Sequence, residues 1–191
     1  MIRLIFKAIQ RLAENQQIKP VRHHGNTSTV QFVKMPPVTD WGSEAANAQN
    51  SGDLAWMINA LDSDSPLNDK HFLFMTIVNQ TYKKRQEPEM RKICREIGFR
   101  HVNLFSKIKP IISRDIGFVS SVSTFKQLAI LLTEDGEFEE AIKLSRRAIR
   151  FGVHDGTDSG FEGRIQRIIK KAEKAGVQIP AKYKNPTEPK T

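Results

Sequence analysis

Apolar residues recur every three or four positions through much of this chain, and that spacing predicts amphipathic α-helices. The clearest stretch runs from Phe125 to Ala148, where two such patterns are joined by a short turn that ends in Asp135-Gly136. The other helical patterns cover residues 2–14, 53–61, 69–82, 87–97, 102–114 and 159–175. Because no alternation of strands and helices accompanies them, the sequence predicts an all-α fold.

Glycine and proline set the expected ends of these helices. Pro88 suits a first helical turn, whereas Gly98 is a stop signal and Pro110 kinks or shortens the helix that follows. Gly136 can adopt the left-handed conformation that ends the first helix of the hairpin. The candidate N-caps are Asp53, Asn68 or Asp69, and Asp158 or Ser159.

The helical pattern fails over residues 16–51, where prolines and glycines punctuate a stretch rich in Ser, Thr and Asn. One alternating run within it, residues 27–33, predicts a strand or an extended arm lying across the helices. The chain from Pro180 onward is polar and proline-rich, with too little apolar surface to order itself. The predicted organisation is an N-terminal helix and extended arm, a helical domain and a disordered tail, over residues 1–51, 52–178 and 179–191.

The sequence favours a cytoplasmic location. No apolar run approaches the ~20 residues that a membrane-spanning helix requires, and the run Leu4-Ile5-Phe6 is interrupted by Lys7, unlike a signal peptide. The single cysteine, Cys94, cannot form an intramolecular disulfide, which fits a reducing compartment. Residues 2–14 are either a helix docked on the protein or a basic helix at a membrane surface. We favour docking, because this helix is short and only moderately charged.

The net charge of +9 is spread over alternating acidic and basic zones. Two basic sets stand out, one where the helix over 69–82 ends and the next begins, and one opposite the apolar face of the last helix. Solvated helix faces are the simpler interpretation; contact with nucleic-acid phosphates or with acidic protein is the functional one. No aromatic residues are interleaved with these cations, which argues against specific nucleic-acid readout. The basic patch comprises Arg91, Lys92, Arg95, Arg164, Arg167 and Lys171.

Candidate catalytic and metal-binding residues do not form a recognisable constellation. Asp155-Gly156-Thr157 resembles a phosphatase loop as a string, but a helix precedes it and the second aspartate is missing, so a turn is the better interpretation. The five histidines lack the spacing of metal ligands. Cys94 lies on an apolar helix face and is predicted to be a small buried residue. We therefore expect no metal, no cofactor and no catalytic activity.

The hairpin carries large and small apolar residues in a fixed order, namely Phe125, Leu128, Ala129, Leu132, Gly136, Phe138, Ala141 and Ala148. At these spacings the hairpin resembles the tetratricopeptide repeat, a unit of about 34 residues. Ser145 and Val153 depart from the repeat's aromatic and closing proline. The region from Gly136 to Ile165 also resembles the C-terminal end of tetratricopeptide-like bacterial proteins without a described activity. One repeat cannot bury its own apolar face, so the resemblance implies hairpins stacked as a short solenoid, with the last helix as a cap.

In the family that the hairpin resembles, ligands bind along the inner face of the first helix of each hairpin. Mapped onto this chain, the partner-binding positions are Lys126, Gln127, Ile130 and Thr133. The alternative is that these residues pack under the N-terminal arm. The leading hypothesis is a protein- or peptide-binding adaptor or scaffold without catalytic activity. The alternative is a basic accessory protein that binds nucleic acid through its Lys and Arg helix faces. The residues specify a class of partner, and leave its identity and the oligomeric state open.

Overall fold

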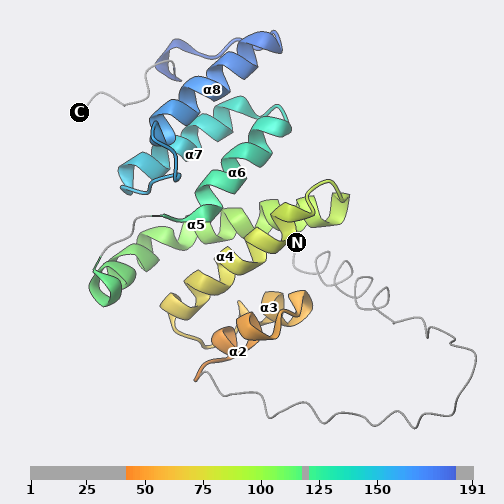
Figure 1. Ribbon diagram of the computed structural model, residues 1–191, viewed down its shortest axis with the longest axis vertical. Helices are drawn as coiled ribbons and strands as arrows, with labels where there is room; N and C mark the ends of the chain where they lie inside the picture. The colour runs from red at the N-terminus through yellow and green to blue at the C-terminus, as the bar shows by residue number, and fades with distance from the viewer. Residues whose placement is uncertain (1–41, 118–120, 184–191) are drawn as a thin grey trace, which may run out of the picture.

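The computed structural model of the protein describes residues 42–117 and 121–183 (Figure 1). Within these ranges the regular structure is helical, which confirms the predicted all-α class, and the one pairing of extended segments is an isolated bridge between Ser121 and His154. The predicted helix over 2–14 and the alternating run at 27–33 lie outside the described residues. The elements are α2 (Glu44–Ser51), α3 (Leu54–Ala60), α4 (Leu67–Lys83), α5 (Pro88–Ile116), α6 (Ser123–Glu134), α7 (Phe138–Arg150), α8 (Gly160–Lys174) and the 3-10 helix η1 (Ala181–Tyr183).

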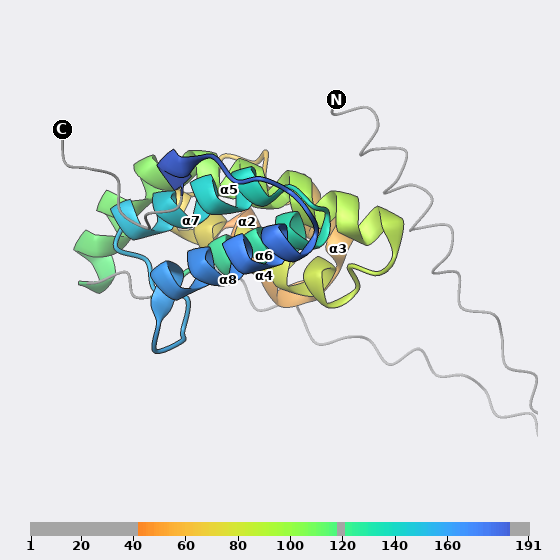
Figure 2. The same ribbon diagram turned by 90° about the horizontal axis from the view of Figure 1, so that it is seen from above.

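The helices follow one another as packed pairs along the long axis of the molecule (Figure 1). α4 pairs with α5 and α6 with α7, while α2 and α3 cover one end of the stack and α8 packs on α7 at the other. Seen from above, α4, α6 and α8 lie on one side, and α5 and α7 lie on the other (Figure 2). Because α6 contacts both α4 and α5, it joins the two central pairs.

Helix α2 begins inside the stretch that the sequence analysis assigned to the irregular arm, so that prediction is wrong for residues 44–51. Ser43 caps the helix, since its hydroxyl accepts a hydrogen bond from the backbone N–H of Ala46 at 3.1 Å and donates one to Asp69 at 2.7 Å. Ala45 and Ala48 are fully buried in contact with the rest of the domain. Two alanines give a weak helical pattern, and the helix is held by packing rather than by that pattern.

Helix α5 is one continuous helix. The sequence predicted that a helix would end at Gly98, but α5 continues through it. Pro110 lies inside the same helix and does not end it. A Cβ atom at position 98 would lie 3.4 Å from Cδ1 of Leu128, an ordinary van der Waals contact, so Gly98 lies where α5 packs against α6. Pro110 removes the hydrogen bond to the carbonyl of Ser106. Ser106 is exposed, so water can replace that bond. Tertiary contacts thus overrule two local breakers.

The α6–α7 hairpin forms as its sequence predicts. Gly136 has φ +78°, and the N–H of Glu137 donates to the carbonyl of Leu132 at 2.8 Å to close the end of α6. Ala129 and Ala141 are fully buried where the two helices meet. Ser145 is buried where an aromatic residue was expected, and its hydroxyl donates to the carbonyl of Ala141 at 2.8 Å, so it leaves no unpaired donor.

The predicted disordered tail is ordered over its first five residues, which corrects the boundary at residue 178. Beyond α8 the chain turns at Gly176 and runs to η1, and Ile179 and Tyr183 are both buried against the core. Arg146 of α7 donates to the carbonyl of Lys182 at 2.7 Å, and its guanidinium lies 5.3 Å from the centre of the Tyr183 ring. Two apolar anchors separated by a short strap therefore add residues 179–183 to the folded domain.

Candidate functional site

A hollow of ≈ 340 Å³ lies along α6 on the α4 and α6 side of the molecule, and we call it the α6 hollow. Ser123, Lys126, Gln127 and Ile130 line it at positions i, i+3, i+4 and i+7, so one face of α6 forms its base. The remaining lining residues come from the end of α4 and from the two loops beside the isolated bridge, namely Tyr82, Ser121, Val122, His154, Asp155 and Gly156.

The α4 wall of this hollow is fixed by two contacts. Gln127 donates from Nε2 to Oδ1 of Asn79 at 2.5 Å, which ties α6 to α4 in the middle of the hollow. Tyr82 lies one turn further along α4, and the guanidinium of Arg85 sits 4.2 Å from the centre of its ring. Burial raises the pKa of the Tyr82 phenol, which keeps it protonated and able to donate a hydrogen bond.

The loop wall is held by a buried ion pair. Asp155 Oδ2 accepts from Nε and Nη2 of Arg164 at 3.0 and 2.7 Å, and its Oδ1 accepts from the backbone N–H and the hydroxyl of Thr157. Burial alone would raise the pKa of Asp155, but the hydrogen bonds from Thr157 and Arg164 lower it. The Asp-Gly-Thr sequence is thus a structural turn with Gly156 at φ +77°, as its sequence context indicates. The carboxylate of Asp155 therefore serves to hold this loop rigid.

The structure brings together three of the four predicted partner-binding residues. Lys126, Gln127 and Ile130 all line the α6 hollow, whereas Thr133 does not. Thr133 is buried, and its hydroxyl donates to the carbonyl of Ala129 at 2.6 Å. Ser123 and Tyr82 were not among the predicted residues. Ser123 could have been found by continuing the same helical stripe one turn back, but nothing in the sequence places Tyr82 beside it.

The first predicted basic set is largely neutralised. At the turn between α6 and α7, three arginines of the α4–α5 pair meet three carboxylates, with N···O distances between 2.6 and 3.4 Å. These residues are Arg85, Arg91 and Arg95 with Glu134, Asp135 and Glu137. Lys92 is exposed on the same helix. The network ties the α6–α7 turn to the α4–α5 pair and leaves Arg91 and Arg95 less available to an outside anion.

The second predicted basic set is divided. Arg164 was expected on the solvent face of α8, but it is 9% exposed and bonded to Asp155, so that expectation is wrong. Position 164 follows Phe161 by three residues and therefore borders the buried face. Arg167 and Lys171 are exposed on α8 as predicted, and Arg167 lies 3.7 Å from the same carboxylate of Asp155.

A buried polar chain that the sequence analysis missed crosses the core. Nδ1 of His71 lies 2.9 Å from Nε2 of His101, and Nδ1 of His101 lies 2.8 Å from Oγ1 of Thr124. The chain links α4, α5 and α6. Burial lowers the pKa of His71 to about 4, and burial together with His71 holds the pKa of His101 well below its ordinary value. Both imidazoles are therefore neutral near pH 7, and they serve packing rather than surface chemistry.

The buried Cys94, like His71 and His101, is not placed to react with a ligand at the surface. Cys94 is fully buried, as predicted, and burial raises the pKa of its thiol to about 11, which disfavours the reactive thiolate. In the part of the chain that the structure describes, no group of three or more His, Cys, Asp or Glu side chains is arranged to hold a metal ion.

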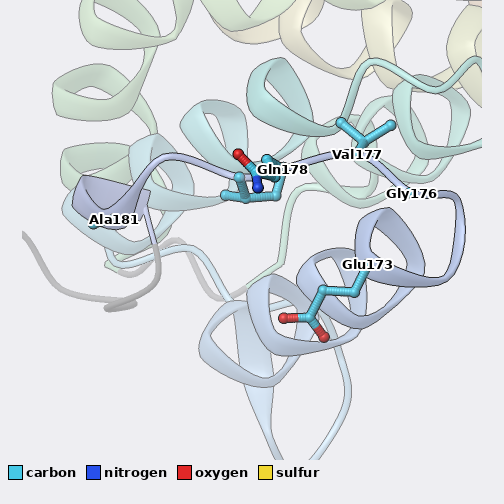
Figure 3. Close-up of a pocket in the computed structure, with 6 residues that line it drawn as sticks. Glu173, Gly176, Val177, Gln178 and Ala181 are labelled. Carbon is cyan, nitrogen blue, oxygen red and sulfur yellow. The ribbon is translucent and has the colours of Figure 1, made fainter.

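Another hollow, of ≈ 460 Å³, lies where the strap after α8 returns across the domain (Figure 3). Its lining residues are Glu173, Gly176, Val177, Gln178, Ile179 and Ala181. Glu173 is the one charged side chain among them, and Val177 is 43% exposed. This hollow offers a ligand fewer polar anchors than the α6 hollow does.

Comparisons with protein-family models, with curated proteins and with solved structures found no match. Among the helices that the structure describes, none is both long enough and apolar enough to cross a lipid bilayer.

Proposed function

We propose that this protein is an adaptor that binds an extended peptide of a partner protein in the α6 hollow. In this proposal the α4–α5 and α6–α7 pairs are tetratricopeptide-like units stacked as a short solenoid, and α8 is the capping helix. The single observation that carries the proposal is that Lys126, Gln127 and Ile130, chosen from the repeat register, line one hollow. The close contact of α6 with both members of the preceding pair supports the stacked arrangement.

The lining suggests how such a peptide would be held. Lys126 would pair with a carboxylate, and the half-buried Ile130 would receive an aliphatic side chain. Tyr82 can exchange hydrogen bonds with the peptide backbone, whereas the hydroxyl oxygen of Ser123 is buried. Most of the binding free energy would come from the aliphatic anchor, while Lys126 would set orientation and association rate.

The nucleic-acid alternative has less support from the structure. Arg91 and Arg95 already face three carboxylates, and Arg164 is buried. These pairs reduce the counterion release that would drive binding to a polyanion. The cations of the predicted patch that are exposed are Lys92, Arg167 and Lys171, and Arg167 lies 3.7 Å from Asp155.

A selection from a random peptide library tests the adaptor proposal. We expect peptides with an aliphatic residue near a carboxylate to be enriched on the immobilised protein. Lys126→Glu and Ile130→Asp should each weaken the selected peptides at least about tenfold, equivalent to about 1.4 kcal/mol. Lys174→Glu, at the exposed end of α8, is the matched charge control and should bind them normally.

Two results would contradict the proposal. One is equal affinity of the selected peptides for the wild-type protein and for both hollow variants, with folding confirmed by circular dichroism. The other is that all partners captured from cells disappear after nuclease treatment and that no protein partner stays bound at raised salt. That second result would favour the nucleic-acid alternative.

A further inference from the structure

The start of α2, the loop before α4 and the first turns of α4 meet at one corner of the molecule. The hydroxyl of Ser43 donates to Oδ2 of Asp69 at 2.7 Å, and the backbone N–H of Ala45 donates to the hydroxyl of Ser65 at 3.0 Å. These bonds bring one carboxylate from each of the three segments into the same neighbourhood. We call this surface the α2–α4 corner, and its members are Glu44, Asp64, Asp69, Phe72 and Met75.

Phe72 gives the α2–α4 corner an exposed apolar side chain. It follows Asp69 by three residues, so the two are neighbours on the surface of α4. Phe72 is 39% exposed, and its ring centre lies 5.2 Å from that of the buried His71, in an edge contact that orients it. Met75, one turn further along α4, is partly exposed and continues the apolar strip.

The charge of the α2–α4 corner is negative. Residues 42–69 contain no lysine or arginine, and Lys70 is the first cation to follow. Glu44 and Asp64 are exposed, and Asp69 is partly exposed. Within the described ranges these three carboxylates form no ion pair, whereas the neighbouring Asp62 pairs with Arg100. A cation that approaches this corner therefore meets carboxylates that are not yet neutralised.

The described structure begins at this same corner, since Gly42 directly precedes Ser43. Among the preceding residues, the sequence predicts a helix over 2–14 with an apolar stripe on one face and with Arg3, Lys7 and Arg11 outside that stripe. Residues 15–41 can span at most about 90 Å, so their length does not prevent that segment from returning to the corner. A tethered segment also has a high effective concentration at a surface of its own chain.

We propose that residues 2–14 of this chain dock on the α2–α4 corner. The apolar stripe of the segment would cover Phe72 and Met75, and its three cations would lie opposite the three carboxylates of the corner. Most of the binding free energy would come from the apolar contact. The ion pairs are close to the solvent, so they would contribute little energy and would mainly set the orientation of the helix.

Other exposed surfaces suit this basic segment less well. Val177, at the far end of the stack, is also exposed, but Lys174 follows the same face of α8 as Lys170 and Lys171, and like charges repel. The α6 hollow contains Lys126, and its carboxylate, Asp155, is already bonded to Arg164. The docking proposal thus does not depend on the function proposed for the α6 hollow.

Carbodiimide cross-linking of the full-length protein tests the proposal, because this reagent joins a lysine directly to a carboxylate that it contacts. Mass spectrometry of the digested monomer should find Lys7 joined to Glu44, Asp64 or Asp69. We expect these products to be at least about tenfold more abundant than products that join Lys7 to the exposed Glu162 and Glu173 of α8. Mixing unlabelled and isotope-labelled protein before the reaction separates cross-links within a chain from those between chains.

Variants locate the contact. Phe72→Ser should lower the yield of the corner cross-links at least about tenfold, because it removes the exposed ring that the stripe would cover. Val177→Ser removes a hydrophobic side chain of similar exposure from the other end of the stack, and it should change the yield less than about twofold. The double variant I5D/I9D should act like Phe72→Ser, and it alters no residue of the described domain.

Three outcomes would overturn the proposal. The first is that wild-type protein gives no corner cross-link, or gives the same yield as Phe72→Ser with folding confirmed by circular dichroism. The second is that the cross-links form only between labelled and unlabelled chains, which would make a second copy the occupant. The third is that the protein sediments with phosphatidylserine vesicles, loses this property in I5D/I9D and forms no corner cross-link, which would make a membrane surface the occupant.

Discussion

Mild acid should destabilise this protein through its buried imidazoles. The pKa of His71 falls from 6.5 to about 4 on folding because burial disfavours the charged ring. A folded-state pKa below the unfolded one means that the unfolded chain binds more protons. The stabilisation is therefore complete above pH 6.5 and is lost as the pH falls from 6.5 toward 4.

The size of the effect follows from the same shift. At about pH 5, protonation of the unfolded chain at position 71 alone reduces the free energy of unfolding by roughly 2 kcal/mol relative to neutral pH. His101 acts in the same direction, since its pKa is also held well below its ordinary value. Asp155 and Glu134 have lowered pKa values, so their contributions are lost at more acidic pH than this comparison uses.

Urea denaturation monitored by circular dichroism at pH 7.5 and at pH 5 measures the loss. His71→Asn is the matched control, because an asparagine amide can replace Nδ1 in the contact with His101 but does not titrate. We expect the wild-type protein to lose roughly 2 kcal/mol more than His71→Asn between the two pH values. The same pH dependence in both proteins would refute the assignment of His71 as a buried neutral base.

Three substitutions test the packing. Arg164→Met should destabilise the fold by about 3 kcal/mol in urea denaturation, because it leaves Asp155 buried without its partner. Adding Asp155→Asn should recover part of that loss, and no recovery would contradict the ion-pair account. Gly98→Val should cost more than about 1 kcal/mol, since its γ-carbons enter the space of Leu128; an unchanged midpoint would show that α5 and α6 can separate. Tyr183→Ala should cost about 3 kcal/mol and lower the thermal midpoint, whereas a neutral result would make the strap dispensable.

The α6 hollow shows which of its lining residues could be predicted from the sequence. The partner-binding residues were taken from the repeat that the hairpin resembles, and three of them share one face of α6 because the helix has 3.6 residues per turn. Thr133 lies outside the hollow, where its short side chain is covered and its hydroxyl bonds back to Ala129. Tyr82 and the loop at 154–156 could not be inferred, since they reach the hollow through the packing of separate elements.

Charge was the least predictable property. The sequence places Arg164 in a basic run on α8, but it cannot show that Asp155 lies within 2.7 Å. The arginines at 91 and 95 likewise meet carboxylates some forty residues away in the sequence. Pairing at long sequence separation decides whether a cation is available.

The amino-acid sequence by itself determined the helical class, the α6–α7 hairpin, its turn at Gly136 and the buried face of α8, because each of these depends on periodicity and backbone preference within about a dozen residues. Only the tertiary structure decided that α5 continues through Gly98 and Pro110, that Ala45 and Ala48 support a helix, and that Tyr183 belongs to the core. In each of those cases the local signal is weak or opposed, and the contacts made with other helices outweigh it.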